Sequence, residues 1–170
     1  MHSTIKTGRR ALVVLAIATS AVTTAPLVGT AAGSTAGTQV LTTFADKCFD
    51  VEGGSIDDYA PIIQYSCKGS FNQQFRITDA GNGQVEIRTF ADKCLDVKGA
   101  GTDDYTPIIQ YTCTGADNQR FKVATVANGQ VEVRTFAGKC LDVKAASPDD
   151  YTSIIQYSCT SAYNQRFWID

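Results

Sequence analysis

Apolar and polar residues alternate over short stretches of this chain, and one series of such stretches recurs. Alternation over Gln84–Phe90 has the period of two that is typical of a half-buried β-strand. Cys94–Val97 predicts a second short strand, ended by Gly99 and Gly101. Pro107–Cys113 is rich in β-branched and aromatic residues and predicts a third strand, where proline is tolerable because it opens the strand.

A fourth strand is predicted over Gln119–Val123, before a turn at Asn128 and Gly129. An Asn-Gly pair favours the positive φ angles of a tight hairpin. No segment shows a sustained helical period, so the pattern predicts an all-β fold.

The series is an internal repeat with a period of 46 residues, marked by cysteines at positions 48, 67, 94, 113, 140 and 159. Segments 84–121 and 130–167 align without gaps and agree at 29 of 38 positions, while the copy over about 37–75 is more divergent. We expect repeats over about 37–82, 83–128 and 129–170, which leave no room for a separate catalytic domain. Three repeats of four strands predict a closed, threefold domain, because closure removes exposed sheet edges.

The six cysteines are expected to form disulfides. They allow fifteen pairings, but only pairing within each repeat gives the three copies the same geometry. The predicted disulfides are Cys48–Cys67, Cys94–Cys113 and Cys140–Cys159. Each would close a loop of 19 residues and contribute about 3 kcal/mol in the loop-entropy account.

The first 32 residues differ from the rest and are typical of a secretory signal. Lys6, Arg9 and Arg10 precede an apolar run over 11–18, and small residues follow to Ala32. The apolar run is far shorter than the roughly 20 residues of a membrane span. We therefore expect residues 1–32 to be removed from a secreted protein that does not insert into membranes.

Composition narrows the function further. Without the signal segment, twelve Lys and Arg stand against seventeen Asp and Glu, a net charge of −5, and no histidine remains. An acidic domain without a basic run has no electrostatic footprint for nucleic acid. Without imidazole, a Ser-His-Asp triad and a His-ligated zinc site are excluded, and no cofactor or metal is expected.

Three motifs, each present three times, connect the chain to a known family. The first is Cys-Phe/Leu-Asp-Val, beginning at Cys48, Cys94 and Cys140. The second is an aromatic residue two before the second cysteine, and the third is Asn-Gln-x-Phe, beginning at Asn72, Asn118 and Asn164. With these motifs the chain resembles the ricin B-type lectins, a β-trefoil family that includes the family 13 carbohydrate-binding modules of secreted bacterial hydrolases.

The resemblance implies a β-trefoil with one shallow sugar pocket in each repeat. Sugar hydroxyls would be held by an aspartate, namely Asp50, Asp96 and Asp142. The apolar sugar face would stack on a tyrosine, namely Tyr65, Tyr111 and Tyr157. An asparagine would add a bond and the following glutamine would support the aspartate, in the pairs Asn72-Gln73, Asn118-Gln119 and Asn164-Gln165. A carboxylate, an amide and an aromatic face suit the hydroxyls and C–H surface of a pyranose.

Two departures from the family pattern bear on these roles. The tryptophan of its Q-x-W motif is replaced by Phe75, Phe121 and Phe167, which we expect in the core. Many relatives place a glutamine four residues before the second cysteine, whereas here it lies three before it, as Gln64, Gln110 and Gln156. A shift of one residue turns a strand side chain to the opposite face, so these glutamines are assigned no sugar contact.

The acidic pairs Asp57-Asp58, Asp103-Asp104 and Asp149-Asp150 invite a catalytic interpretation, since each precedes a tyrosine. Glycoside hydrolysis needs two carboxyl groups on opposite sides of a sugar, which neighbours in a turn do not provide. We expect solvated turns instead, with Tyr59, Tyr105 and Tyr151 as candidates for the pocket edge. Trp168 has no counterpart in the other repeats and is expected to pack where the barrel closes.

The sequence therefore predicts a secreted, non-enzymatic, monomeric lectin with up to three glycan sites, for galactose- or xylose-type sugars. The alternative is a β-trefoil that binds proteins, such as a protease inhibitor, through one distinctive loop. The nearest candidate for such a loop is the segment 145–148.

Overall fold

The computed structural model describes residues 37–170, and the predicted signal segment 1–32 lies outside the described residues. This part contains twelve short strands and seven single-turn 3-10 helices. Within residues 37–170 no helix is long and apolar enough to cross a membrane. The prediction of an all-β fold is confirmed.

Each repeat contributes four strands. The first repeat contains β1 (Leu41–Thr42), β2 (Lys47–Val51), β3 (Ile62–Ser66) and β4 (Arg76–Gly81). The second contains β5 (Gln84–Arg88), β6 (Cys94–Val97), β7 (Ile108–Tyr111) and β8 (Lys122–Thr125). The third contains β9 (Val131–Arg134), β10 (Cys140–Val143), β11 (Thr152–Tyr157) and β12 (Trp168–Ile169).

The 3-10 turns also follow the repeat. One follows the second strand of each repeat: η1 (Glu52–Gly54), η3 (Lys98–Ala100) and η6 (Lys144–Ala146). One precedes the fourth strand: η2 (Phe71–Gln73), η4 (Asp117–Gln119) and η7 (Tyr163–Gln165). The turn η5 (Ala127–Gly129) lies between β8 and β9 without a counterpart among the described residues.

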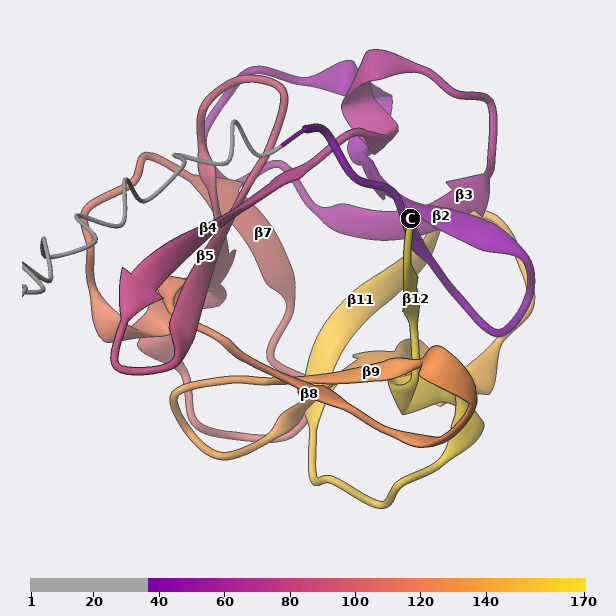
Figure 1. Ribbon diagram of the computed structural model, residues 1–170. Coiled ribbons are helices and arrows are strands. Elements are labelled where there is room, and N and C mark those ends of the chain that lie inside the picture. Colours follow the sequence, from indigo (N-terminus) through magenta and orange to yellow (C-terminus); the bar gives the residue numbers. More distant parts are fainter. Residues whose placement is uncertain (1–36) are drawn as a thin grey trace, which may run out of the picture. The chain divides into compact units, whose positions relative to one another are not determined.

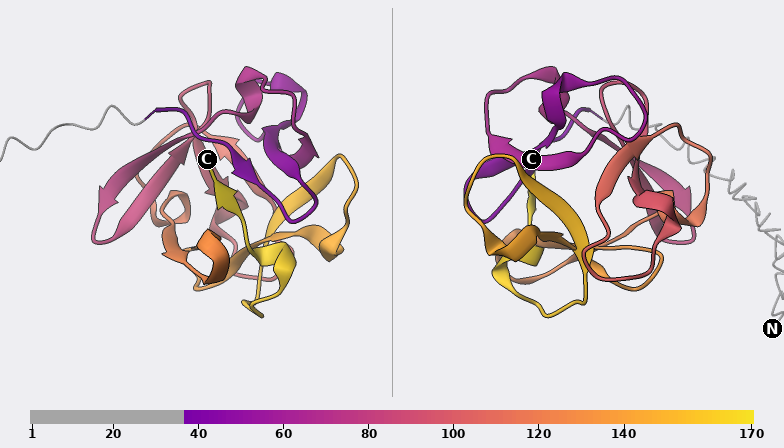
Figure 2. Two further views of the ribbon diagram at one scale, coloured as in Figure 1. Left: turned by 45° about the vertical axis from the view of Figure 1, so that its right-hand side comes forward. Right: turned by 180° about the vertical axis from the view of Figure 1, so that it is seen from behind.

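The strands form a β-trefoil with pseudo-threefold symmetry (Figure 1). Antiparallel pairs β4–β5, β8–β9 and β12–β1 connect one repeat to the next. The third strands meet one another around the axis, through Thr152 opposite Gln64 and through bridges from Pro107 to Ile155 and from Pro61 to Ile109. The right-hand view of Figure 2 shows the three repeats as three lobes around the pseudo-threefold axis, seen from behind.

The barrel closes where the last strand pairs with the first. Trp168 lies opposite Thr42, and Ile169 opposite Leu41. The C-terminus consequently lies beside the first repeat (Figure 1). The prediction that Trp168 lies at this closure is confirmed.

The core is built from five positions of the repeat, each filled in all three copies. The corresponding trios are Leu41, Ile87 and Val133; Phe49, Leu95 and Leu141; Val51, Val97 and Val143; Ile62, Ile108 and Ile154; Phe75, Phe121 and Phe167. The last trio occupies the family's tryptophan position and is at most 1% exposed. The expectation that these phenylalanines lie in the core is confirmed.

The fourth strand starts later than the alternation predicts. Asn118 and Gln119 lie in η4, and β8 begins at Lys122. The chain forms a 3-10 turn here because the Gln119 side-chain carbonyl accepts a hydrogen bond from the backbone N–H of Thr114, five residues earlier (2.7 Å). Asn128 and Gly129 have the predicted positive φ angles of 60° and 75°, although within a 3-10 turn rather than a two-residue hairpin.

Three disulfides join cysteines within each repeat. They are Cys48–Cys67, Cys94–Cys113 and Cys140–Cys159, with Cα–Cα distances of 5.1 Å in each case. Each links the start of the second strand to the segment that follows the third. The predicted pairing is confirmed, and it brings the candidate aspartates and tyrosines onto paired neighbouring strands.

Candidate functional site

The structure contains three similar surface cavities, one per repeat, and each collects the predicted aspartate, tyrosine and asparagine. The cavity of the first repeat measures about 330 Å³ and those of the second and third about 250 Å³ each. The trios are Asp50, Tyr65 and Asn72; Asp96, Tyr111 and Asn118; Asp142, Tyr157 and Asn164. Residues more than 20 positions apart in sequence thus converge three times.

Each aspartate projects from the second strand of its repeat and is held with only 5% of its surface exposed. Asp50 Oδ2 accepts a bond of 2.9 Å from Gln73 Nε2, Asp96 Oδ2 one of 2.9 Å from Gln119, and Asp142 Oδ2 one of 2.8 Å from Gln165. Burial raises the pKa of all three carboxyl groups above the ordinary 3.8, although these amide bonds oppose the rise. Each carboxylate oxygen has two lone pairs, so a carboxylate that accepts one or two bonds within the protein keeps acceptor capacity for a ligand.

The asparagines lie in the 3-10 turns before the fourth strand. Their amides donate to the backbone carbonyl of the valine after each aspartate: Val51 (3.1 Å), Val97 (3.2 Å) and Val143 (3.1 Å). Asn72 also donates to Asp50 Oδ1 at 2.8 Å. These bonds fix the amide beside the carboxylate at the cavity wall.

The glutamines of the Asn-Gln pairs lie behind the wall. Gln73, Gln119 and Gln165 are at most 1% exposed, and besides the aspartate each donates to a backbone carbonyl at 3.0 Å. Their carbonyl oxygens accept from backbone N–H groups at 2.7–2.8 Å. A ligand in the cavity cannot reach a side chain so enclosed, so these residues act by positioning the aspartate.

A second tyrosine lines each cavity and comes from a different repeat. Tyr59 of the first repeat lies 5.1 Å from the ring of Tyr111 in the second, edge to face. In the same way Tyr105 lies on Tyr157 of the third repeat, and Tyr151 on Tyr65 of the first. Every cavity is therefore completed by a tyrosine of another repeat: the first repeat completes the second cavity, the second the third, and the third the first. Treating each repeat as a separate unit does not predict this contact.

These second tyrosines have unusual backbone angles. Their φ values are 70°, 67° and 64° for Tyr59, Tyr105 and Tyr151. Bulky residues rarely occupy this left-handed region, which costs on the order of 1–3 kcal/mol. Their side chains are nevertheless 58–63% exposed, so core packing does not account for their presence.

In each acidic pair that precedes these tyrosines, the second acid is bound by the next repeat. Asp58 accepts bonds from Lys93 Nζ (2.6 Å) and Thr112 N (2.8 Å) of the next repeat. Asp104 does so with Lys139 and Ser158, and Asp150 with Lys47 and Ser66. The bond from lysine holds the pKa of each carboxyl below 3.8. The acidic pairs lie in turns as expected, but the second acid is ion-paired and only partly exposed, because the next repeat places a lysine beside it.

The glutamines three residues before the second cysteine fasten the same turns from inside. Gln64, Gln110 and Gln156 are fully buried. Gln110 Nε2 donates to Ser55 O and Asp57 O, each at 2.8 Å, and the other two make equivalent bonds. They therefore hold the turn that carries the second tyrosine, and they face away from the cavities.

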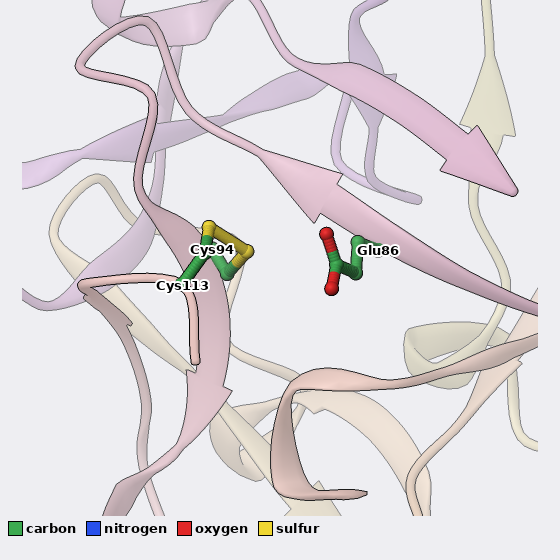
Figure 3. Close-up of side chains that lie close together, drawn as sticks. All are labelled: Glu86, Cys94 and Cys113. Atoms are coloured by element: carbon green, nitrogen blue, oxygen red, sulfur yellow. A yellow bond between two sulfur atoms is a disulfide. The ribbon is translucent and has the colours of Figure 1, made fainter. Parts of the chain in front are cut away.

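A carboxylate beside a pair of cysteines is the one arrangement that suggests a metal centre among the described residues. It occurs as Glu86 with Cys94 and Cys113, and again as Glu132 with Cys140 and Cys159. Figure 3 shows that the two sulfurs near Glu86 are bonded to each other. Disulfide sulfur is not the thiolate that metals bind, and Glu86 pairs with Arg88 at 2.8 Å. The cluster is therefore structural.

Comparison with known proteins identifies the family. Residues 36–167 match the ricin-type beta-trefoil lectin domain, and the chain belongs to this family. Its fold is similar to ThreeFoil, a designed threefold symmetric protein, at 37% identity over 78% of this chain and 97% of that one, with a TM-score of 0.77.

Two natural proteins show the same fold. An exo-beta-1,3-galactanase from Clostridium thermocellum matches at 32% identity over 78% of this chain but only 30% of its own length, with a TM-score of 0.76. The Rhizoctonia solani agglutinin matches at 20% identity over 79% of this chain and 94% of that one, with a TM-score of 0.70, which bears on the fold alone. Family and fold together support a non-enzymatic carbohydrate-binding protein, and the three disulfides are consistent with an extracellular location.

Proposed function

We propose that this protein is a secreted lectin that binds one sugar in each of the three cavities, without cleaving it. The observation that carries the proposal is the threefold convergence of an aspartate, a tyrosine and an asparagine on one cavity wall. In each cavity the carboxylate accepts bonds from two neighbouring hydroxyls, and the asparagine amide adds a further contact. The C–H face of the sugar stacks on Tyr65, Tyr111 or Tyr157.

Binding without hydrolysis is supported by the carboxyl groups of the cavities. One aspartate lines each cavity, whereas most glycosidases flank the scissile bond with two carboxyl groups. The acids that precede the second tyrosines, Asp58, Asp104 and Asp150, are bound by lysines at 2.6 Å. They hold neighbouring repeats together and are not available as acid or base.

The proposed ligands are galactose- or xylose-type sugars of a polysaccharide or cell surface. A shallow cavity of 250–330 Å³ with one carboxylate gives weak binding at each site. Engagement of several sites by one polymer raises the effective strength by roughly 10²–10⁴. A glycan array probed with the purified protein tests the proposal. Multivalent galactosides or xylans should be retained, and an array without any bound glycan would refute it.

Binding should weaken in acid at a pH above that expected for an ordinary aspartate. Sugar hydroxyls donate to the ionised carboxylate, which exists above its pKa, and burial raises the pKa of Asp50, Asp96 and Asp142 above 3.8. Retention on a polysaccharide column should therefore be constant near neutral pH and fall as the pH decreases through this raised value. Undiminished retention at pH 3.8 would contradict the role of the carboxylates.

The second tyrosine of each cavity should strengthen binding across the repeat boundary. Tyr151→Ala in the third repeat is expected to weaken the site of the first repeat about 3- to 10-fold, since an aromatic pair contributes about 0.5–1.5 kcal/mol. The signal of the Asn72 side-chain amide in an NMR titration with a monosaccharide reports this site. Tyr163→Ala is the matched control, because this ring is equally exposed but packs on Phe44 outside the three cavities. Equal effects of the two variants would refute the cyclic arrangement.

A further inference from the structure

The threefold pattern is broken at the junction between the second and third repeats. At the other two junctions an aromatic residue of a 3-10 turn covers a phenylalanine of the next repeat. Phe71 packs on Phe90 and Tyr163 packs on Phe44, each with ring centroids 4.8 Å apart. At the junction between the second and third repeats, Asp117 takes the place of the aromatic residue, so Phe136 is not covered by an aromatic ring of the preceding repeat.

A carboxylate present at the junction between the first two repeats is also missing at this junction. Between the first two repeats, Arg76 pairs with Asp92. The positions 46 residues later hold Lys122 and Gly138, so the cation remains but its carboxylate does not. Among residues 37–170, Lys122 forms no ion pair, whereas its neighbour Arg134 is paired with Glu132 at 2.6 Å.

The loss of both groups leaves a cavity of about 510 Å³, larger than any of the three proposed glycan cavities. Its wall includes Gln84, Asp117, Lys122, Arg134, Phe136 and Gly138. An aromatic ring, an amide, a carboxylate and an unpaired ammonium therefore face one space. The first three are the groups that suit a sugar, and the fourth suits a negative charge.

We propose that this cavity is a fourth site, which binds a sugar carrying a carboxylate, such as a uronic acid unit of a polysaccharide. The sugar carboxylate pairs with Lys122. It thus takes the role that the Asp92 carboxylate has for Arg76 in the preceding repeat. The C–H face of the ring packs on Phe136, while hydroxyls bond to Asp117 and Gln84. A neutral sugar leaves the ammonium without a partner and binds less tightly. The site is independent of the three aspartate-centred cavities.

The chain itself provides variants that close the cavity. Gly138→Asp restores the carboxylate of the preceding repeat, and Asp117→Phe restores its aromatic cover. Gly138 has a φ of 72°, which Asp46 and Asp92 adopt at the equivalent positions with φ angles of 55° and 58°. A Cβ atom at Gly138 meets no atom within 4 Å, so the substitution is accommodated.

The experiment is an NMR titration of the protein with D-glucuronate and, separately, with D-glucose. It is carried out on the Asp50→Asn/Asp96→Asn/Asp142→Asn variant, so that the proposed glycan cavities do not contribute. We expect glucuronate to shift the backbone amide signals of 134–138 with millimolar affinity, and glucose to bind at least 10-fold more weakly. Gly138→Asp/Asp117→Phe should abolish these shifts, and Lys122→Gln should weaken binding at least 10-fold.

Arg76→Gln is the matched control for the charge change, because it lies at the equivalent position of the first repeat and should leave glucuronate binding unchanged. Equal affinity for glucose and glucuronate, shifts that persist in the closed variant, or the absence of any shift would overturn the proposal. Loss of glucuronate binding here leaves the three other sites untouched, since their ligands are tested with neutral sugars.

Discussion

Replacing Asp50, Asp96 and Asp142 together by asparagine is expected to abolish retention of the protein on a polysaccharide column. Each substitution removes the charge that strengthens two bonds from sugar hydroxyls, and hydrogen bonds to charged groups contribute about 1.5–3 kcal/mol each. A single site should therefore lose at least about 10-fold in affinity, and the three losses combine when one polymer engages several sites.

The fold is expected to survive these changes. Asparagine has the shape of aspartate, and its carbonyl oxygen still accepts the bond that Gln73, Gln119 or Gln165 donates. At position 50 the bond from Asn72 is lost, but that amide still donates to the Val51 carbonyl. The matched control replaces Asp57, Asp103 and Asp149 by asparagine, so the change in net charge is the same. These three residues are exposed and precede the lysine-bound acids. Retention by the first variant, or equal loss by both variants, would show that these carboxylates do not hold the sugar.

Phe121→Ala is expected to lower the free energy of unfolding by about 3–5 kcal/mol, because a large buried side chain is lost and a cavity remains. The ring is fully buried and belongs to a core cluster that includes residues of all three repeats, and the Phe121 backbone bridges to Val85. For a domain of this size such a loss lowers Tm by about 10–20 °C. Thermal unfolding followed by circular dichroism, with the disulfides intact, measures the change.

Phe71→Ala is the control for this change, since it removes the same ring from a position that is 59% exposed. It should lower the free energy of unfolding by about 1 kcal/mol or less, the amount of one aromatic pair with Phe90. A Phe121→Ala variant as stable as Phe71→Ala would contradict the role of the phenylalanine trio in the core.

Much of the fold can be predicted from the sequence because the repeat is so regular. A constant period of 46 residues and three cysteine pairs imply one geometry for all copies, and the alternation in 84–90 marks a real strand, β5. The replacement of tryptophan by Phe75, Phe121 and Phe167 changes only the volume of a core side chain. These predictions depend on local periodicity and on covalent spacing, which the sequence displays directly.

The contacts between repeats could not be predicted in this way. Asp58 and Lys93 lie 35 residues apart in sequence, and their pairing depends on how one repeat packs on the next. One signal was present: a lysine precedes the first cysteine of every repeat, at positions 47, 93 and 139, and an acid ends every acidic pair. Two groups of opposite charge that recur in phase indicate a repeated ion pair, but not which copies it joins.

In the sites, too, the residues that come from one repeat could be predicted, and the residue that comes from the preceding repeat could not. Asp96, Tyr111 and Asn118 could be chosen from motifs within one repeat, and they do share one cavity wall. The contribution of Tyr59 to that cavity follows from the position of a turn in the preceding repeat, which Gln110 holds through two backbone carbonyls. A motif within a single repeat carries no information on this contact.

The crystal structure of the protein with a bound monosaccharide, chosen from the glycan array, tests the central claim most directly. The sugar should occupy the three cavities, with two hydroxyls within hydrogen-bond distance of Asp50, Asp96 or Asp142. Its C–H face should stack on Tyr65, Tyr111 or Tyr157, beside the tyrosine of another repeat. Sugar bound elsewhere on the surface, with all three cavities empty, would contradict the account.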